Sequence, residues 1–106
     1  MTQGIKAAAV ILLAALIVVP AFALTPGADT YKAKCAMCHG ADGLAATAMA
    51  KNLKVLSFKD PAMLKASDAK FFASTKNGLN KMPAYNGKLT DAQIKDVVSY
   101  IRTLQK

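Results

Sequence analysis

The chain has 106 residues, of which 54% are hydrophobic, and a formal net charge of +8 at pH 7. This hydrophobic share excludes a disordered chain, and two cysteines are too few for a disulfide-rich scaffold. The lack of tryptophan and the 7% of aromatic residues exclude an aromatic-rich binding surface. A single small domain has a marginal core of its own, so a cofactor or metal is expected to add stability.

Residues 1–23 have the three parts of a secretory signal peptide. Lys6 is the positive start, residues 7–19 are apolar, and Ala21-Phe22-Ala23 supplies the small residues of a cleavage site. We therefore predict cleavage after Ala23, export to a bacterial periplasm, and a mature domain of residues 24–106. The alternative is a retained membrane anchor, because the apolar run is close to the shortest that spans a bilayer.

The first half of the mature chain predicts two helices separated by a loop. Residues 27–38, which are rich in Ala and Lys, predict the first helix. Residues 39–58 contain glycines near their start and show weak periodicity, so we predict that they are mostly loop. Asp60 is a capping residue before a proline at the first helical position, which predicts a short helix that ends at about Lys65.

The second half predicts two more helices around another loop. A helix from Ala69 is expected to end at Asn77-Gly78, where glycine can adopt a positive φ. Residues 80–88 contain proline, asparagine and glycine and are predicted to be loop. Thr90 and Gln93 then form a capping box, followed by apolar side chains at helical spacing: Ile94, Val97, Val98, Ile101 and Leu104. The predicted fold class is all-α, with long loops that need something central to pack against.

The motif Cys35-Ala36-Met37-Cys38-His39 has the C-x-x-C-H spacing of c-type haem attachment. Two thiols on one helical turn can each add to one of the two vinyl groups of a haem, and the histidine that follows then lies under the iron. We predict one haem c, bound covalently through Cys35 and Cys38, with His39 as a ligand to its iron.

The cysteine pair has three other possible interpretations. A thioredoxin-like redox pair would need a βαβ context, which a helical chain lacks. Structural zinc usually takes four Cys or His ligands, of which the chain has three. A disulfide between Cys35 and Cys38 is the third alternative.

The other axial ligand must be a different residue type, because His39 is the only histidine in the chain. Met82 stands before a proline in an irregular loop, where the locked φ of the ring lets the backbone present a side chain rigidly. A thioether is a soft, neutral ligand that raises the reduction potential. Met37 lies inside the attachment motif and cannot fold back onto the iron, and Met49 and Met63 are expected to fill the core. Met82 is therefore the predicted second ligand.

These features resemble those of the class I cytochromes c, in particular the small monohaem bacterial kind, over nearly all of residues 26–105. The matching positions are Gly27, Tyr31, Cys35, Cys38 and His39, together with Gly78, Met82 and Pro83. The resemblance implies a small cytochrome c fold, with short helices and loops wrapped around one covalently attached haem. It also implies that Gly27 lets the first and last helices approach closely, with Tyr31 and Tyr100 packed at their crossing.

The sequence differs from better-known class I cytochromes c in two ways, and each difference leaves the residue for one expected contact unidentified. No proline lies between His39 and Pro61, so the backbone carbonyl that would hold the His39 ring cannot be named. Arginine is absent before Arg102, so the haem propionates must meet other groups, with Asn52, Lys81 and Tyr85 as candidates. The residues expected to surround the haem, or only to form core, are Leu53, Leu56, Phe58, Leu64, Phe71, Phe72 and Leu79.

With His39 and Met82 on its two sides, the iron has no open position for a substrate, so one-electron transfer through an exposed haem edge remains. We expect a periplasmic electron carrier that shuttles single electrons between redox partners, and not an enzyme. One alternative is a haem-bearing or membrane-tethered subunit of a larger respiratory oxidoreductase. Another is a haem enzyme or gas sensor in which Met82 is displaced.

The net positive charge of the chain limits which binding partners are expected. Basic side chains are spread along the chain, so binding to nucleic acid is not expected of an exported haem protein. The lysines either confer solubility alone or form a docking face for acidic redox-partner proteins in transient, salt-sensitive encounters. The members of such a face would be Lys34, Lys51, Lys54, Lys81 and Lys88. A monomer is expected, with membrane contact only if the leader is retained.

Overall fold

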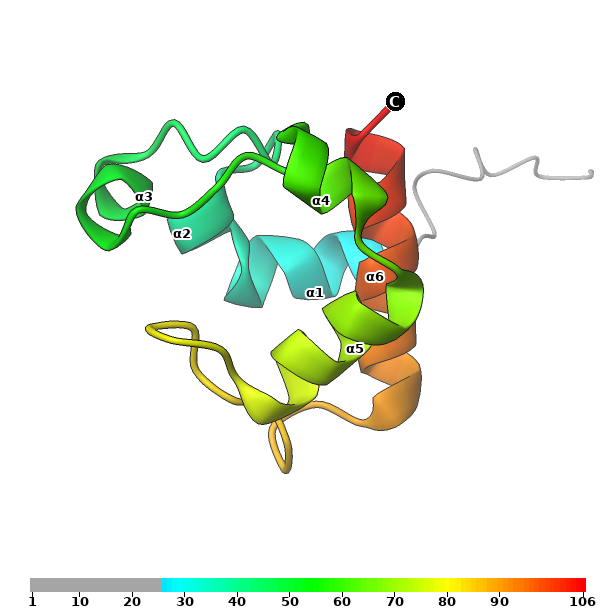
Figure 1. The fold of residues 1–106 in the computed structure, drawn as a ribbon. Helices are drawn as coiled ribbons and strands as arrows, with labels where there is room; N and C mark the ends of the chain where they lie inside the picture. The colour runs from blue at the N-terminus through cyan, green and yellow to red at the C-terminus, as the bar shows by residue number, and fades with distance from the viewer. Residues whose placement is uncertain (1–25) are drawn as a thin grey trace, which may run out of the picture.

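A computed structural model describes residues 26–106, which form six helices joined by loops and turns (Figure 1). The helices are α1 (Pro26–Lys34), α2 (Ala36–His39), α3 (Ala48–Leu53), α4 (Pro61–Lys65), α5 (Asp68–Asn77) and α6 (Asp91–Leu104). This part of the chain has isolated β-bridges but no strand, so the all-α prediction is confirmed. The predicted signal peptide lies outside the described residues. Between residues 26 and 106 no helix is long and apolar enough to cross a membrane.

Helices α1 and α6 cross at close range (Figure 1). Gly27 lies at the crossing, where a Cβ would overlap the backbone carbonyl of Asp96. The rings of Tyr31 and Tyr100 pack there with centroids 5.2 Å apart. The close approach and the tyrosine pair that the resemblance implied are therefore confirmed. The Tyr31 hydroxyl also donates a hydrogen bond to the Gly40 carbonyl at 2.7 Å, which fastens α1 to the end of α2.

The core is built mainly on one face of α6. The predicted capping box is present: the Gln93 N–H donates to the Thr90 hydroxyl at 3.1 Å, and the Thr90 N–H donates to the Gln93 carboxamide at 2.8 Å. The apolar stripe that follows is buried against α1 and α5. The buried cluster consists of Tyr31, Cys35, Phe58, Phe71, Leu89, Ile94, Val97, Val98 and Ile101. Because Cys35 is a member, the attachment motif is continuous with the core.

The helix predicted over residues 27–38 is interrupted at Cys35. Helix α1 ends at Lys34 and α2 begins at Ala36. The φ of −116° at Cys35 departs from the helical value, so the chain turns at this residue. The Cys35 carbonyl still accepts hydrogen bonds from the N–H groups of Cys38 and His39. The motif therefore keeps the single turn that its spacing requires.

Residues 39–58, which were predicted to be mostly loop, contain helix α3. Thr47 caps this helix, because its hydroxyl oxygen accepts a hydrogen bond from the Ala50 N–H at 3.0 Å. The same hydroxyl lies 3.3 Å from the carbonyls of Met37 and Cys38, to which it can donate. A helix of 6 residues with one buried side chain, Ala50, shows almost no apolar period, which explains why the pattern missed it.

Helices α4 and α5 form where they were predicted. The carboxylate of Asp60 caps α4 and the hydroxyl of Ser67 caps α5, and α5 ends before Gly78 at a φ of +80°. Arg102 near the end of α6 donates to the Asp68 carboxylate at 2.7 Å. Its guanidinium also donates to the carbonyl of Ala66 at 2.6 Å. These contacts attach the corner between α4 and α5 to the C-terminal helix.

Candidate functional site

A cavity of about 420 Å³ lies between the attachment motif and the loop that carries Met82. This volume falls within the usual range of cofactor sites. All four predicted site residues line it: Cys35, Cys38, His39 and Met82. The structure thus brings together side chains that are as far apart in the chain as α2 and the loop after α5.

The wall of the cavity is mostly apolar. Of the residues expected to surround a haem, five line it: Leu53, Leu56, Phe58, Phe71 and Leu79. Leu64 is not among the lining residues and its side chain is 48% exposed. Phe72 packs against the core cluster instead. The lining also includes Val97 and Ile101, so helix α6 borders the cavity as well.

Both cysteines are free thiols in this structure, which gives no support to the disulfide alternative. Burial raises the pKa of the Cys35 thiol to about 11, and the neighbouring Cys38 adds to the shift. A neutral form of sulfur is therefore favoured at this position. A thioether is neutral, so the environment of Cys35 suits a covalent link to a haem better than it suits a thiolate.

The His39 ring lies beside the cavity with its Nδ1 atom buried. Burial lowers the pKa of His39, which favours the neutral imidazole that metal ligation needs. Within the described part of the chain, Nδ1 has no hydrogen-bond partner. The ring is instead stacked on Phe58, with centroids 4.7 Å apart and an interplanar angle of 17°.

Met82 is presented by a tight turn after α5. The N–H of Met82 donates to the Leu79 carbonyl at 2.9 Å, and the N–H of Leu79 donates to the Met82 carbonyl at 3.2 Å. Gly78 makes this turn possible, because its backbone lies at φ +80° and ψ +162°, a region that is essentially restricted to glycine. The Tyr85 N–H donates to the Thr75 carbonyl at 3.0 Å and returns the loop to α5.

Met63 of α4 also lines the cavity, which the sequence did not indicate. Its side chain is half-buried and packs against the core, as predicted for a filling residue. Met49, which was also predicted to fill the core, is 42% exposed, so that prediction was wrong, and Met37 is 73% exposed. Two thioethers, from Met63 and Met82, therefore border the same space as His39.

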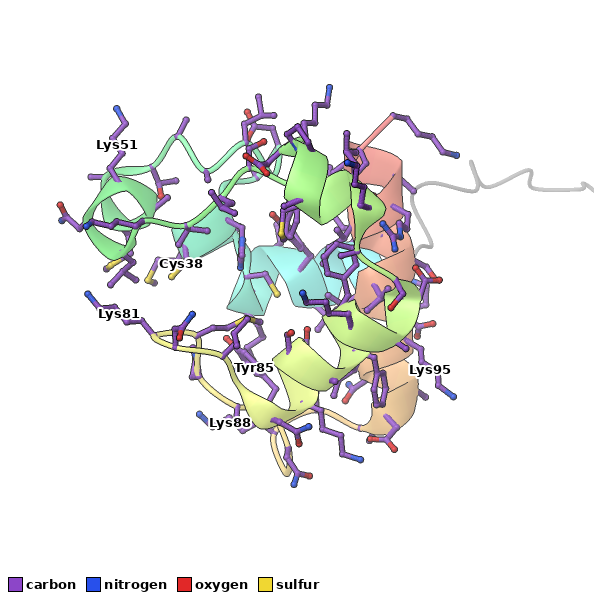
Figure 2. All side chains as sticks on the ribbon, viewed as in Figure 1. Cys38, Lys51, Lys81, Tyr85, Lys88 and Lys95 are labelled. Carbon is purple, nitrogen blue, oxygen red and sulfur yellow. The ribbon has the colours of Figure 1, made fainter. Side chains whose placement is uncertain are left out.

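Four of the residues that line the cavity are lysines. Lys34, Lys54, Lys70 and Lys81 line it and are exposed. Lys70 was not predicted, and Lys51 and Lys88 from the predicted docking face are not lining residues. Figure 2 shows Lys51 and Lys81 on the same side of the molecule as Cys38, with the Lys51 side chain pointing outward, whereas Lys95 lies on the opposite side. Of the three candidates for the propionates, Lys81 and Tyr85 line the cavity and Asn52 does not.

Two cysteine sulfurs, which could attach a haem covalently, border one apolar cavity together with an imidazole and a thioether, which could bind its iron. The chain matches a family model described as cytochrome C oxidase, cbb3-type, subunit III, over residues 22–101. A cytochrome c6 from Synechococcus sp. is 38% identical over 84 residues, which cover 77% of this chain and 72% of that protein. A cytochrome c6 from Limnospira maxima is 38% identical over 82 residues, which cover 71% of this chain and 85% of that protein. The solved structure of the KustC0563 c-type cytochrome superposes with a TM-score of 0.69 at 29% identity, covering 76% of this chain and 98% of that one.

Proposed function

This chain belongs to the cytochrome c family as a small monohaem class I member, and from that membership we propose that it is a periplasmic carrier of single electrons with His39 and Met82 as the iron ligands. Membership in the family means that the protein carries one haem c, covalently attached through Cys35 and Cys38. Its cytochrome c6 relatives support an electron carrier rather than an enzyme.

The observation that supports the ligand assignment is the shared cavity: His39 and Met82 line it together with both cysteines. When bound there, the haem supplies an iron that accepts and returns one electron. His39 and Met82 would fill both axial positions, and so exclude a substrate from the metal. The apolar wall excludes water and thereby tunes the potential.

The docking face is part of the proposal. It is formed by four exposed lysines that line the cavity and place positive charge beside the proposed haem site: Lys34, Lys54, Lys70 and Lys81. Charges at the rim of an encounter mainly set the rate of association, which falls as salt rises. We therefore expect the protein to act as a monomer that docks transiently on acidic redox partners.

A second candidate is a haem-bearing subunit of a larger respiratory oxidoreductase. The family model that matches the chain carries the description of such a subunit, which favours this candidate. The cytochrome c6 relatives favour a separate carrier. Fractionation of cells that express the full chain separates the two: a carrier released after cleavage at Ala23 is recovered in the periplasmic extract, and a retained leader or a bound partner leaves it in the membrane fraction.

The ligand assignment is tested by Met82→Ala, with Met63→Ala as the matched control. Both residues line the cavity, so both variants remove a thioether from it. We expect that only Met82→Ala abolishes the weak red sulfur-to-iron band of the oxidised protein and lets the reduced protein bind CO. If Met63→Ala abolishes the band instead, Met63 is the ligand. A wild-type protein that binds CO at once would favour the haem enzyme or gas sensor.

A further inference from the structure

Arg102, near the end of α6, is the only arginine in the chain, and its guanidinium holds several groups at once. It donates to the Asp68 carboxylate at 2.7 Å and to the Ala66 carbonyl at 2.6 Å. It also donates to the Gln105 carboxamide oxygen at 2.9 Å. The guanidinium carbon lies over the Phe71 ring, 4.6 Å from its centroid, which is within the range of a cation–π contact. Such a set of contacts suits the planar fork of an arginine, and a lysine ammonium does not reproduce it.

Gln105 extends these contacts to an earlier stretch of the chain. Its carboxamide nitrogen lies 2.9 Å from the Phe58 carbonyl and 3.3 Å from the Met63 carbonyl, and it donates to both. Its oxygen accepts from Arg102, so the two side chains form a connected pair. The pair therefore holds residues 58–71, which include α4 and the start of α5, against the end of α6.

The residues held by this pair form one wall of the cavity. We call them the inner wall: Phe58, Met63, Ala66 and Phe71 all line the cavity. Phe58 and Phe71 are only 3% and 6% exposed, so their rings belong to the core. Arg102 and Gln105 are not lining residues themselves. They lie behind the inner wall and can act on the cavity only through it.

The fit of the inner wall bears on the reduction potential. A ferric haem carries one more positive charge than a ferrous haem, so water beside it favours the ferric state and lowers the potential. We propose that Arg102, together with Gln105, is the positioning residue of the inner wall, and that it keeps the potential high by keeping this wall closed to water. The proposal rests on the proposed function, because a tuned potential serves a carrier of single electrons.

Lys76 offers a matched control on the same pair of helices. Its ammonium lies 3.1 Å from the Asp91 carboxylate of α6 and 5.8 Å from the centroid of the Phe72 ring. Its side chain is 32% exposed, against 29% for Arg102. Phe72, however, does not line the cavity. Loss of Lys76 therefore removes the same charge and the same kinds of contact but leaves the inner wall held.

The test compares the reduction potentials of Arg102→Met and Lys76→Met in the full-length, exported and haem-loaded protein. We expect Arg102→Met to lower the potential and Lys76→Met to leave it close to wild type. Hydrogen exchange followed by mass spectrometry gives a second readout, in which the amides of residues 58–71 should exchange faster in Arg102→Met alone. An unchanged potential in Arg102→Met, or an equal fall in both variants, would overturn the proposal.

Arg102→Lys separates the fork from the charge. An ammonium keeps the positive charge near Asp68 and Phe71, but it cannot also hold the Ala66 carbonyl and Gln105. We expect the potential of Arg102→Lys to lie below that of wild type. A wild-type potential in this variant would show that charge alone acts on the iron, and the positioning role would be wrong.

A milder change covers the case in which Arg102→Met does not load haem. Gln105→Leu removes the donor to the Phe58 and Met63 carbonyls and alters no charge. It should lower the potential by a smaller amount, and an unchanged potential would overturn the proposal.

The weak red sulfur-to-iron band, recorded in the same samples, separates this proposal from the ligand assignment. A wild-type protein without the band would refute Met82 as the ligand, while the comparison of potentials still decides the role of Arg102. We expect the band to persist in Arg102→Met. Its loss there would assign the fall in potential to the release of Met82 and would overturn the proposal.

Discussion

The two sides of the haem cavity are built differently. The His39 side consists of α1, α2 and α6, and its central residues Tyr31 and Val97 are each 1% exposed. The Met82 side is the stretch from residue 78 to 89, which is closed by isolated bridges and a few backbone hydrogen bonds. Leu79 on this side is 54% exposed, and Gly78, Asn80 and Gly87 all have positive φ.

This difference predicts two kinds of failure. A residue on the His39 side belongs to the core, so its loss should lower the free energy of unfolding of the whole domain. A segment with few buried contacts opens locally at a lower free energy than the domain unfolds. Damage on the Met82 side should therefore release the proposed ligand while most of the fold persists. The following four changes test that distinction.

Gly27→Ala should have the largest effect. The new Cβ would overlap the Asp96 carbonyl, which is backbone and can move only if α1 and α6 separate. We expect a loss of about 3 kcal/mol or more in the free energy of unfolding, at the upper end of overpacking effects. Denaturant titration followed by circular dichroism measures it. Gly87→Ala is the comparison. A Cβ there meets no atom within 4 Å, so only the strain of its φ of +82° remains, about 1–2 kcal/mol. A loss as large as that of Gly27→Ala would remove the steric explanation.

Gly78→Ala should come next and act locally. The residue has a backbone conformation that is costly for alanine, and its Cβ would lie 2.9 Å from the Met82 carbonyl oxygen. We expect a cost of about 1–3 kcal/mol. Because the strain falls on the turn, reduced Gly78→Ala should bind CO while its helical content stays close to wild type. If the reduced Gly78→Ala protein binds no CO and the whole domain is destabilised instead, the distinction between the two sides of the cavity is wrong.

Tyr31→Phe should have a smaller effect that depends on pH. Burial, the main cause, raises the pKa of Tyr31 well above its usual value of about 10. Above pH 10 the unfolded chain ionises this group and the folded protein does not, so wild-type stability falls by about 1.4 kcal/mol per pH unit from this residue. Near pH 8 the variant should lose about 1 kcal/mol, because the Gly40 carbonyl keeps a second donor in the Gly43 N–H.

The variant lacks the ionisable group, so its deficit should shrink and then reverse as the pH rises from 9 to 11.5. Denaturation midpoints of both proteins across this range provide the measurement. Lysines titrate in both proteins and cancel in the difference. A deficit that stays constant would show that Tyr31 does not titrate differently on folding.

Tyr85→Phe should have the smallest effect on stability. The Tyr85 hydroxyl donates to the Lys34 carbonyl at 2.9 Å and connects the Met82 loop to the end of α1 across the cavity. This bond is exposed, so its loss should cost about 0.5–1 kcal/mol. We expect added imidazole to displace Met82 faster in this variant, as followed by stopped-flow absorption. Tyr100→Phe, which removes a hydroxyl from the α1–α6 crossing, should leave that rate unchanged.

Local chemistry made much of the site predictable. Cys35, Cys38 and His39 lie within one turn, so their spacing alone placed them together. The caps at Asp60 and Thr90 were visible for the same reason, since each cap binds an N–H two or three residues ahead. The resemblance supplied the crossing at Gly27, which local spacing could not have shown.

Other features depend on packing between segments that are distant in the chain. Met63 and Met82 both border the cavity, and the sequence singled out only the second. Lys70 of α5 lines the same cavity, although the residues next to it in the sequence do not predict this position. The contact between His39 and Phe58 joins residues with a glycine-rich loop and a helix between them.

The sequence by itself determined the haem attachment, the helical class and the capped starts of α4 and α6, because these follow from bonds that span no more than one turn. The tertiary structure decided which side chains meet across the cavity, and which ring packs against the imidazole. Phe58 reaches its position through Gly43 on one side and Gln105 on the other, and the Gln105 contact spans 47 positions of the chain. Only the folded core brings such residues together. Hydrophobic periodicity in the sequence predicts helices, but it does not predict which distant segments pack against each other.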